Sequence, residues 1–136
     1  MDVEVAPEEW SVHNKLGACY ANACENGKAL EQYKLALAHN PFNIRLWVNI
    51  GISHLNSANY DSTVRWLLTA SRLNLDVCHI WSHLSTAASL MNRTDLSDWV
   101  HQMQDGTITE VDPDEFSGEF PAYTHEELAN LDISKI

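Results

Sequence analysis

A pattern around a glycine recurs after 34 residues and constrains the fold of this chain more than any other feature. Gly17 lies in the segment 16–20 (LGACY), and Gly51 lies in the segment 50–54 (IGISH). Self-similarity at a fixed period of this length is typical of repeat proteins, in which each small helical unit buries its apolar face against the next unit. The spacing therefore predicts a helical solenoid, a class of protein that usually binds peptides.

The period extends to other positions, although the match fades in the last helix at Ser97, His101 and Gln104. Small residues at the glycine positions let two helices approach closely, and large residues fill the space beside that contact. This pattern is that of the tetratricopeptide repeat. The matching positions are Leu16, Gly17, Tyr20, Ala29, Tyr33, Ala36 and Pro41 in the first unit, Trp47, Ile50, Gly51, Leu67 and Ala70 in the second (with Thr63 in the place of Ala29), and Trp81, Leu84, Ser85 and Ala88 in the third.

We therefore expect an all-α fold, a tetratricopeptide-repeat helical solenoid of about three helix–turn–helix units with an acidic irregular C-terminal tail. The repeats are expected over residues 8–105 and the tail over 106–136, where Thr124 and Glu127 favour a short capped helix at 124–131. The three units are expected at about 10–41, 44–75 and 78–105. Their helices are expected at about 8–22, 26–39, 43–57, 60–73, 79–91 and 95–104.

The net charge of −11 is concentrated at one end of the chain. Residues 1–93 carry seven Lys/Arg and eight Asp/Glu, whereas residues 94–136 carry eleven acids and the single base Lys135. Composition favours a solvated tail. The alternative is a tail that docks on a basic surface or on a partner.

Several classes of function are disfavoured. No basic patch is present to neutralise phosphates, so nucleic acid is not an expected partner. No stretch approaches the ~20 apolar residues of a membrane span, so direct membrane insertion is not expected. The sequence has no phosphate-binding loop or nucleophile motif, and we expect no enzyme and no cofactor. Cys19, Cys24 and Cys78 form no Cys-x-x-Cys pair and suit reduced, buried thiols.

Polar residues on the first helix of each unit carry the functional argument, because these helices line the inner face of a solenoid. Arg45, Asn49 and Asn56 share one face of the second unit's first helix. An asparagine side chain both donates and accepts, so it can bind the C=O and N–H of a peptide backbone, and a cation can hold a carboxylate. The first unit offers Asn14, Lys15, Ala18 and Asn22.

These segments resemble a known family. Asn14-Lys-Leu-Gly-Ala, Ala21-Asn22, Ile44-Arg45 and the run 49–56 (NIGISHLN) are similar to the C-terminal repeats of the peroxisomal import receptor, which reads the C-terminal Ser-Lys-Leu signal of matrix enzymes. The segments 80–84 and 88–91 are similar to its last repeat. The resemblance covers roughly residues 10–92, which correspond to the second of two sets of repeats in that family.

The resemblance implies roles for individual residues. Residues matching Asn14, Asn49 and Asn56 bind the backbone and terminus of the signal peptide, and the one matching Arg45 neutralises its carboxylate. Residues matching Lys15 and Ala18 form the pocket for the last side chain, with Asn22 beside them. A receptor of this kind binds the C-terminal signal peptides of peroxisomal proteins and cycles between cytoplasm and peroxisome. The alternative function is a non-catalytic adaptor or structural subunit that binds another protein in a larger complex.

Two further features leave alternatives open. His79 and His83 lie one helical turn apart, but no third ligand is placed to complete a metal site, so they are expected to be solvated or to line the groove. If they line the groove, their protonation is expected to tighten binding at lower pH. The chain ends in Ser134-Lys135-Ile136, which resembles the targeting signal itself. This tripeptide is interpreted as a weak signal or as a ligand for the protein's own groove.

Overall fold

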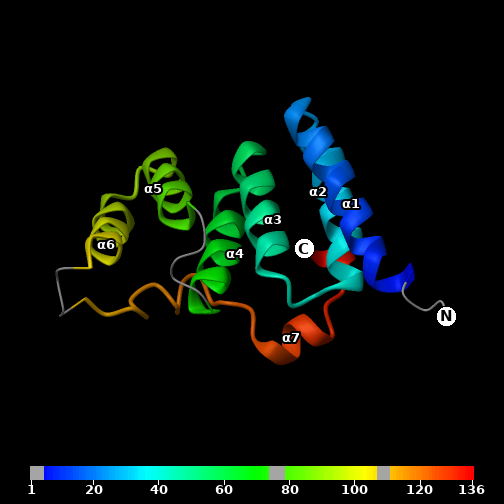
Figure 1. The fold of residues 1–136 in the computed structure, drawn as a ribbon. Coiled ribbons are helices and arrows are strands. Elements are labelled where there is room, and N and C mark those ends of the chain that lie inside the picture. The colour runs from blue at the N-terminus through cyan, green and yellow to red at the C-terminus, as the bar shows by residue number, and fades with distance from the viewer. Residues whose placement is uncertain (1–4, 74–78, 107–110) are drawn as a thin grey trace.

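The structure is a computed structural model that describes residues 5–73, 79–106 and 111–136. Within these ranges all regular secondary structure is helical, and successive helices pack as adjacent antiparallel pairs in a solenoid like that of tetratricopeptide repeats (Figure 1). The pairs are α1 with α2, α3 with α4, and α5 with α6. The elements are α1 (Val5–Asn22), α2 (Asn26–His39), α3 (Ile44–Asn56), α4 (Tyr60–Leu73), α5 (Ile80–Leu90), α6 (Thr94–Asp105), α7 (His125–Ala129) and the 3-10 helix η1 (Ile133–Lys135).

The predicted all-α solenoid is confirmed, and helices α1–α6 begin and end within three residues of their expected positions. The second pair starts as the sequence indicates, because the Asn43 side chain accepts a hydrogen bond from the backbone N–H of Leu46 and caps α3. Thr124 and Glu127 form a reciprocal capping box at the start of α7. The division into repeats 10–41, 44–75 and 78–105 and a tail from residue 106 stays a prediction.

The turn inside each pair repeats at the level of the backbone. Cys24, Ala58 and Asn92 follow one another at the 34-residue period, and each has a left-handed φ, between 57° and 62°. The residue after each of them donates its backbone N–H to a carbonyl five residues earlier, for example Glu25 to Tyr20 at 2.8 Å. This hydrogen bond ends the first helix and reverses the chain. The third unit has the same turn although its second helix departs from the sequence pattern.

The two helices of a pair cross at the repeated glycines. A Cβ atom on Gly17 would lie 2.5 Å from Cε1 of Tyr33 in α2, and one on Gly51 would lie 3.0 Å from Cδ2 of Leu67 in α4. Both large side chains are buried and fill the space beside the crossing, as the sequence pattern predicts. The repeat period therefore reflects one packing contact made twice.

The last helix of the solenoid uses other positions for its core. Helix α6 buries Leu96, Trp99 and Val100 instead of the template positions Ser97 and His101. The Trp99 indole N–H donates to the carbonyl of Asp112 at 2.8 Å, and its ring meets Phe116 edge-on. The decay of the repeat pattern in α6 thus accompanies a contact with the C-terminal segment.

The interpretation of residues 106–136 as a solvated tail is wrong for the described part of that segment. Residues 111–136, which we call the strap, run back across one end of all three helix pairs toward α2 (Figure 1). Phe116, Phe120 and Leu128 are buried in the common core. The strap is irregular for most of its length, as expected, but its apolar side chains anchor it to the solenoid.

The expectation of buried thiols is also wrong where it is tested. Cys19 and Cys24 are free and exposed, because they lie on the outer side of α1 and in the turn that follows it. Cys78 lies outside the described residues. Among the helices that the structure describes, none has the length and apolar character needed to cross a bilayer.

Replacing the crossing glycine tests the packing contact. Gly17→Ala is expected to lower the free energy of unfolding by about 1–2 kcal/mol, because overpacking against the buried Tyr33 ring outweighs the helix propensity of alanine. Gly27→Ala is the matched control, because nothing lies within 4 Å of a Cβ atom at that position. Urea unfolding of both variants measures the difference, and equal stabilities for the two would contradict the tight crossing.

Candidate functional site

Two predicted site residues on neighbouring first helices are in direct contact. The side-chain amide of Asn49 in α3 donates to Oδ1 of Asn14 in α1 at 3.0 Å, and both residues are half-buried. This bond fixes the orientation of both amides. The Nδ2 group of Asn14 and Oδ1 of Asn49 have no other hydrogen-bond partner in the described part of the chain. The pair therefore presents a free donor and a free acceptor, which is the complement of a peptide group.

The other predicted residues lie on the same two helices and are exposed. Arg45 stands in the first turn of α3, one turn before Asn49, and its guanidinium has no ion pair among the described residues. Asn56 is the last residue of α3. No hydrogen bond or ion pair within the described chain links these side chains to the asparagine pair. The exposed residues of the set are Lys15, Ala18 and Asn22 on α1 and Arg45 and Asn56 on α3.

The two histidines of the third pair differ in environment. His79 is exposed and precedes α5 with a left-handed φ of 63°. His83 is half-buried, and burial, followed by the charge of His79, lowers its pKa below the ordinary 6.5. His83 therefore stays neutral to a lower pH than a free histidine, which is against a protonation effect near neutral pH. In the described ranges no group of three or more His, Cys, Asp or Glu residues is arranged to hold a metal ion.

A third histidine, which sequence reasoning missed, is buried in the second helix pair. His54 is 4% exposed, and its Nδ1 lies 3.3 Å from the amide nitrogen of Asn59. Its Nε2 is buried and has no hydrogen-bond partner among the residues that the structure describes. Burial, followed by the charge of Lys34, lowers the pKa of His54 to about 4. His54 occupies the place of Tyr20 in the repeat, and that register is the signal for its burial.

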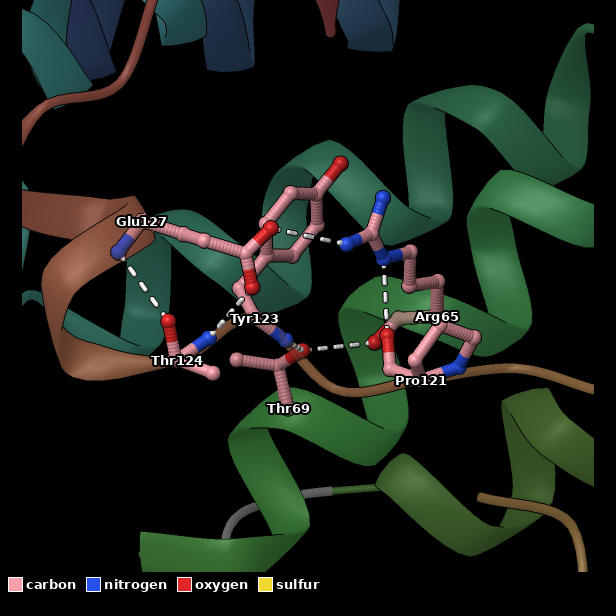
Figure 2. A network of polar contacts seen from close by, with 6 residues as sticks. All are labelled: Arg65, Thr69, Pro121, Tyr123, Thr124 and Glu127. Carbon is pink, nitrogen blue, oxygen red and sulfur yellow. Dashed lines mark hydrogen bonds and ion pairs between the residues drawn. The ribbon is translucent and has the colours of Figure 1, made fainter. Parts of the chain in front are cut away.

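The strap is held by an arginine on α4 that sequence reasoning also missed (Figure 2). Arg65 donates from Nε to the carbonyl of Pro121 at 2.7 Å, and its Nη2 pairs with Glu127 at 3.3 Å. Its guanidinium lies 3.7 Å from the centroid of the Tyr123 ring, and the ring stacks on Trp66 at 4.2 Å. The Tyr123 ring thus contacts both the cation of Arg65 and the indole of Trp66, which are consecutive residues of α4.

Two more arginines pair with acids of the strap. Arg93 makes a bidentate contact with Glu119, at 2.7 and 2.9 Å, and also pairs with Asp95. These hydrogen bonds lower the pKa of Asp95 to about 2 and also lower that of Glu119. Arg72 pairs with Asp114 at 2.9 Å. The acidic segment therefore docks on a basic surface of the chain itself, formed by Arg65 and Arg72 on α4 and by Arg93 directly before α6.

Two cavities in the described part of the chain lie beside the strap. One cavity of about 210 Å³ is lined by side chains of α4, α5, α6 and the strap, among them Trp81, Trp99 and Phe116. Lys135 and Ile136 line a second, more open cavity with Arg65 and Tyr123, and η1 contacts α2. The terminal tripeptide thus lies beside second helices and away from Asn14 and Asn49. This placement is against the hypothesis that it acts as a ligand of the inner face.

The fold is that of a helical-repeat protein in which an asparagine pair joins two neighbouring first helices. No family model matches the chain. A peroxisomal targeting signal receptor of Eremothecium gossypii is 27% identical over 129 residues, which cover 85% of this chain and 21% of that receptor. A peroxisomal targeting signal receptor of Kluyveromyces lactis is 35% identical over 68 residues, covering 50% of this chain and 12% of that receptor.

These similarities support a relationship to peroxisomal targeting signal receptors at low identity. The chain spans 21% of the length of one receptor and 12% of the other, so most of each receptor has no counterpart in the aligned region. The relationship agrees with the resemblance of residues 10–92 and with the all-helical architecture.

The buried histidine makes stability depend on pH. Because the pKa of His54 is about 4 when folded and near 6.5 when unfolded, the unfolded chain binds more protons between these values. The contribution of His54 to the free energy of unfolding is complete above pH 6.5 and is lost as pH falls. The free energy of unfolding should therefore drop by about 2 kcal/mol between pH 7 and pH 5. Urea unfolding at both pH values should show a smaller pH effect in His54→Leu than in the parent chain. His101→Leu, at an exposed position, should keep the parent's pH effect.

Removing the central arginine is expected to loosen the strap. Arg65→Ala deletes the Pro121 hydrogen bond, the Glu127 ion pair and the contact with Tyr123, and should lower the free energy of unfolding by about 1–2 kcal/mol. Amide hydrogen exchange should rise selectively in residues 111–136. Lys28→Ala changes the charge equally but removes an exposed pair with Glu25 and a contact with the Tyr20 ring, neither of which involves the strap, so it should leave exchange in the strap unchanged. Equal exchange in both variants would show that Arg65 does not hold the strap.

Proposed function

We propose that the inner face of α1 and α3 binds C-terminal Ser-Lys-Leu-type signals, as in a receptor for import of peroxisomal matrix proteins. The Asn14–Asn49 contact carries this proposal. Two amides from neighbouring helix pairs leave one donor and one acceptor unoccupied side by side, and a main chain in extended conformation offers the matching C=O and N–H.

The charge of the face fits a peptide that ends in a free carboxylate. Arg45 is exposed, carries no internal ion pair among the described residues, and lies one turn from Asn49 on the same helix. Lys15 follows Asn14 directly on α1 and is also exposed. A guanidinium binds a carboxylate with two parallel hydrogen bonds, which gives selectivity for a chain terminus over an internal segment. Ala18 and Asn22 complete the proposed face one and two turns further along α1.

The similarity to two peroxisomal targeting signal receptors supports the same role. In this proposal the protein is a non-catalytic binding module that works in the cytoplasm and at peroxisomes. The strap lies against the second helices, so a ligand can bind the inner face without any rearrangement of the strap.

A second candidate function is an adaptor or structural subunit of a larger complex. The observation that favours it is an apolar face on α1, where Val12 is 57% and Leu16 is 43% exposed. Exposed apolar side chains grouped on one helix face are typical of protein–protein contacts.

Fluorescence anisotropy with a labelled peptide ending in Ser-Lys-Leu tests the proposed function. Binding should be lost when the peptide terminus is amidated, and Asn49→Ala and Arg45→Ala should each weaken binding about tenfold or more, because each removes a contact to the ligand. Lys28→Ala, on the exposed surface of α2, is the control and should bind as the parent chain does. Absence of carboxylate-dependent binding at high protein concentration would reject the proposal and leave the adaptor function.

A further inference from the structure

The outer side of α1 carries an apolar face that has counterparts elsewhere in the repeat. We define the α1 outer face by Val12, Leu16 and Cys19, which lie on one side of the helix at spacings of four and three residues. All three are exposed. We propose that this face is a docking site for the second helix of a helical-repeat pair that belongs to a partner protein.

The repeat register supplies the first argument. Adding 34 residues to the α1 outer face gives Leu46, Ile50 and Ser53 in α3, and adding 34 again gives Ile80, Leu84 and Ala87 in α5. None of these six counterparts is more than 3% exposed. The same three positions are therefore buried in two helix pairs and open in the first pair.

The second argument is what covers the counterparts. Helix α3 packs against α2 of the preceding pair, and α5 packs against α4 of the preceding pair. In both cases a second helix contacts the next first helix. The occupant that fits the α1 outer face is accordingly a helix placed as α2 is placed beside α3. A solenoid end of this kind is stable in water when a polar capping face covers it, and Val12 and Leu16 do not provide one.

The opposite end of the solenoid argues against a second copy as the occupant. In a head-to-tail stack of two copies, α6 of one copy would meet α1 of the next. The positions of α6 that correspond to Leu30 and Leu37 of α2 are Asp98 and Asp105, both exposed acids. Burying these carboxylates against Val12 and Leu16 would be costly. The partner helix must instead carry apolar side chains, as α2 does with Leu37 fully buried.

Duplication of one repeat in the full chain tests the fit. A chain with residues 10–43 repeated in tandem keeps the Pro41-Phe42-Asn43 turn at the junction and places a second copy of α2 before the downstream α1. Stacking of the two should raise Tm by about 5 °C or more, measured by circular dichroism.

The matched control has the same composition. Val12→Lys with Leu16→Lys in the downstream copy should abolish the rise in Tm, whereas the same pair of substitutions in the upstream copy should leave it. No rise in Tm, or equal effects of the two placements, would overturn the proposal.

Sedimentation of the native chain tests the other candidate occupant, which is a second copy of the chain. The native chain should stay monomeric over a wide concentration range. Self-association that Val12→Lys and Leu16→Lys abolish would overturn the proposal and assign the face to a second copy. All of these readouts are independent of peptide binding, so they stand or fall separately from the proposed function.

Discussion

The close crossing of two helices at a glycine is the contact on which the rest of this structure depends. At Gly17 the Tyr33 ring occupies the space that any Cβ atom would need, and at Gly51 the Leu67 side chain would lie in tight contact with a Cβ atom. The left-handed turn after each first helix then fixes the direction of the second helix. With each pair set in this way, stacking places α1 beside α3, and the amides of Asn14 and Asn49 meet as a consequence of the register.

The strap shows how an acidic segment is accommodated by a nearly neutral solenoid. Its acids pair with Arg65, Arg72 and Arg93, and all three ion pairs are partly exposed. Exposed ion pairs contribute little free energy, so most of the stabilisation comes from buried Phe116, Phe120 and Leu128. The ion pairs determine register, since each acid meets one arginine along the path of the strap.

Periodicity was sufficient to predict the helices and the crossing, because a contact that is repeated at a fixed spacing requires similar residue types at that spacing. The strap could not be predicted in this way, because the arginines that pair with its acids lie 26 to 62 residues away and composition records only its charge. The exposed thiol of Cys19 was missed for a related reason: its counterpart Ser53 is buried where a preceding helix pair is present. The turn position of Cys24 is exposed in all three units, as at Ala58 and Asn92. His54 was visible in the register of Tyr20, but its unpaired Nε2 depends on packing.

The two ends of the solenoid have opposite chemistry, and this difference bears on the inner face as well. Val12 and Leu16 flank Lys15 on α1, so the apolar outer face borders the proposed peptide-binding residues. A helix pair docked there in the repeat register would bring its own first helix beside α1, as α1 lies beside α3. The same operation that joins Asn14 to Asn49 would then extend the polar inner face by one more helix. In that arrangement the docking site and the peptide site are consecutive parts of one surface, built by one repeated packing contact.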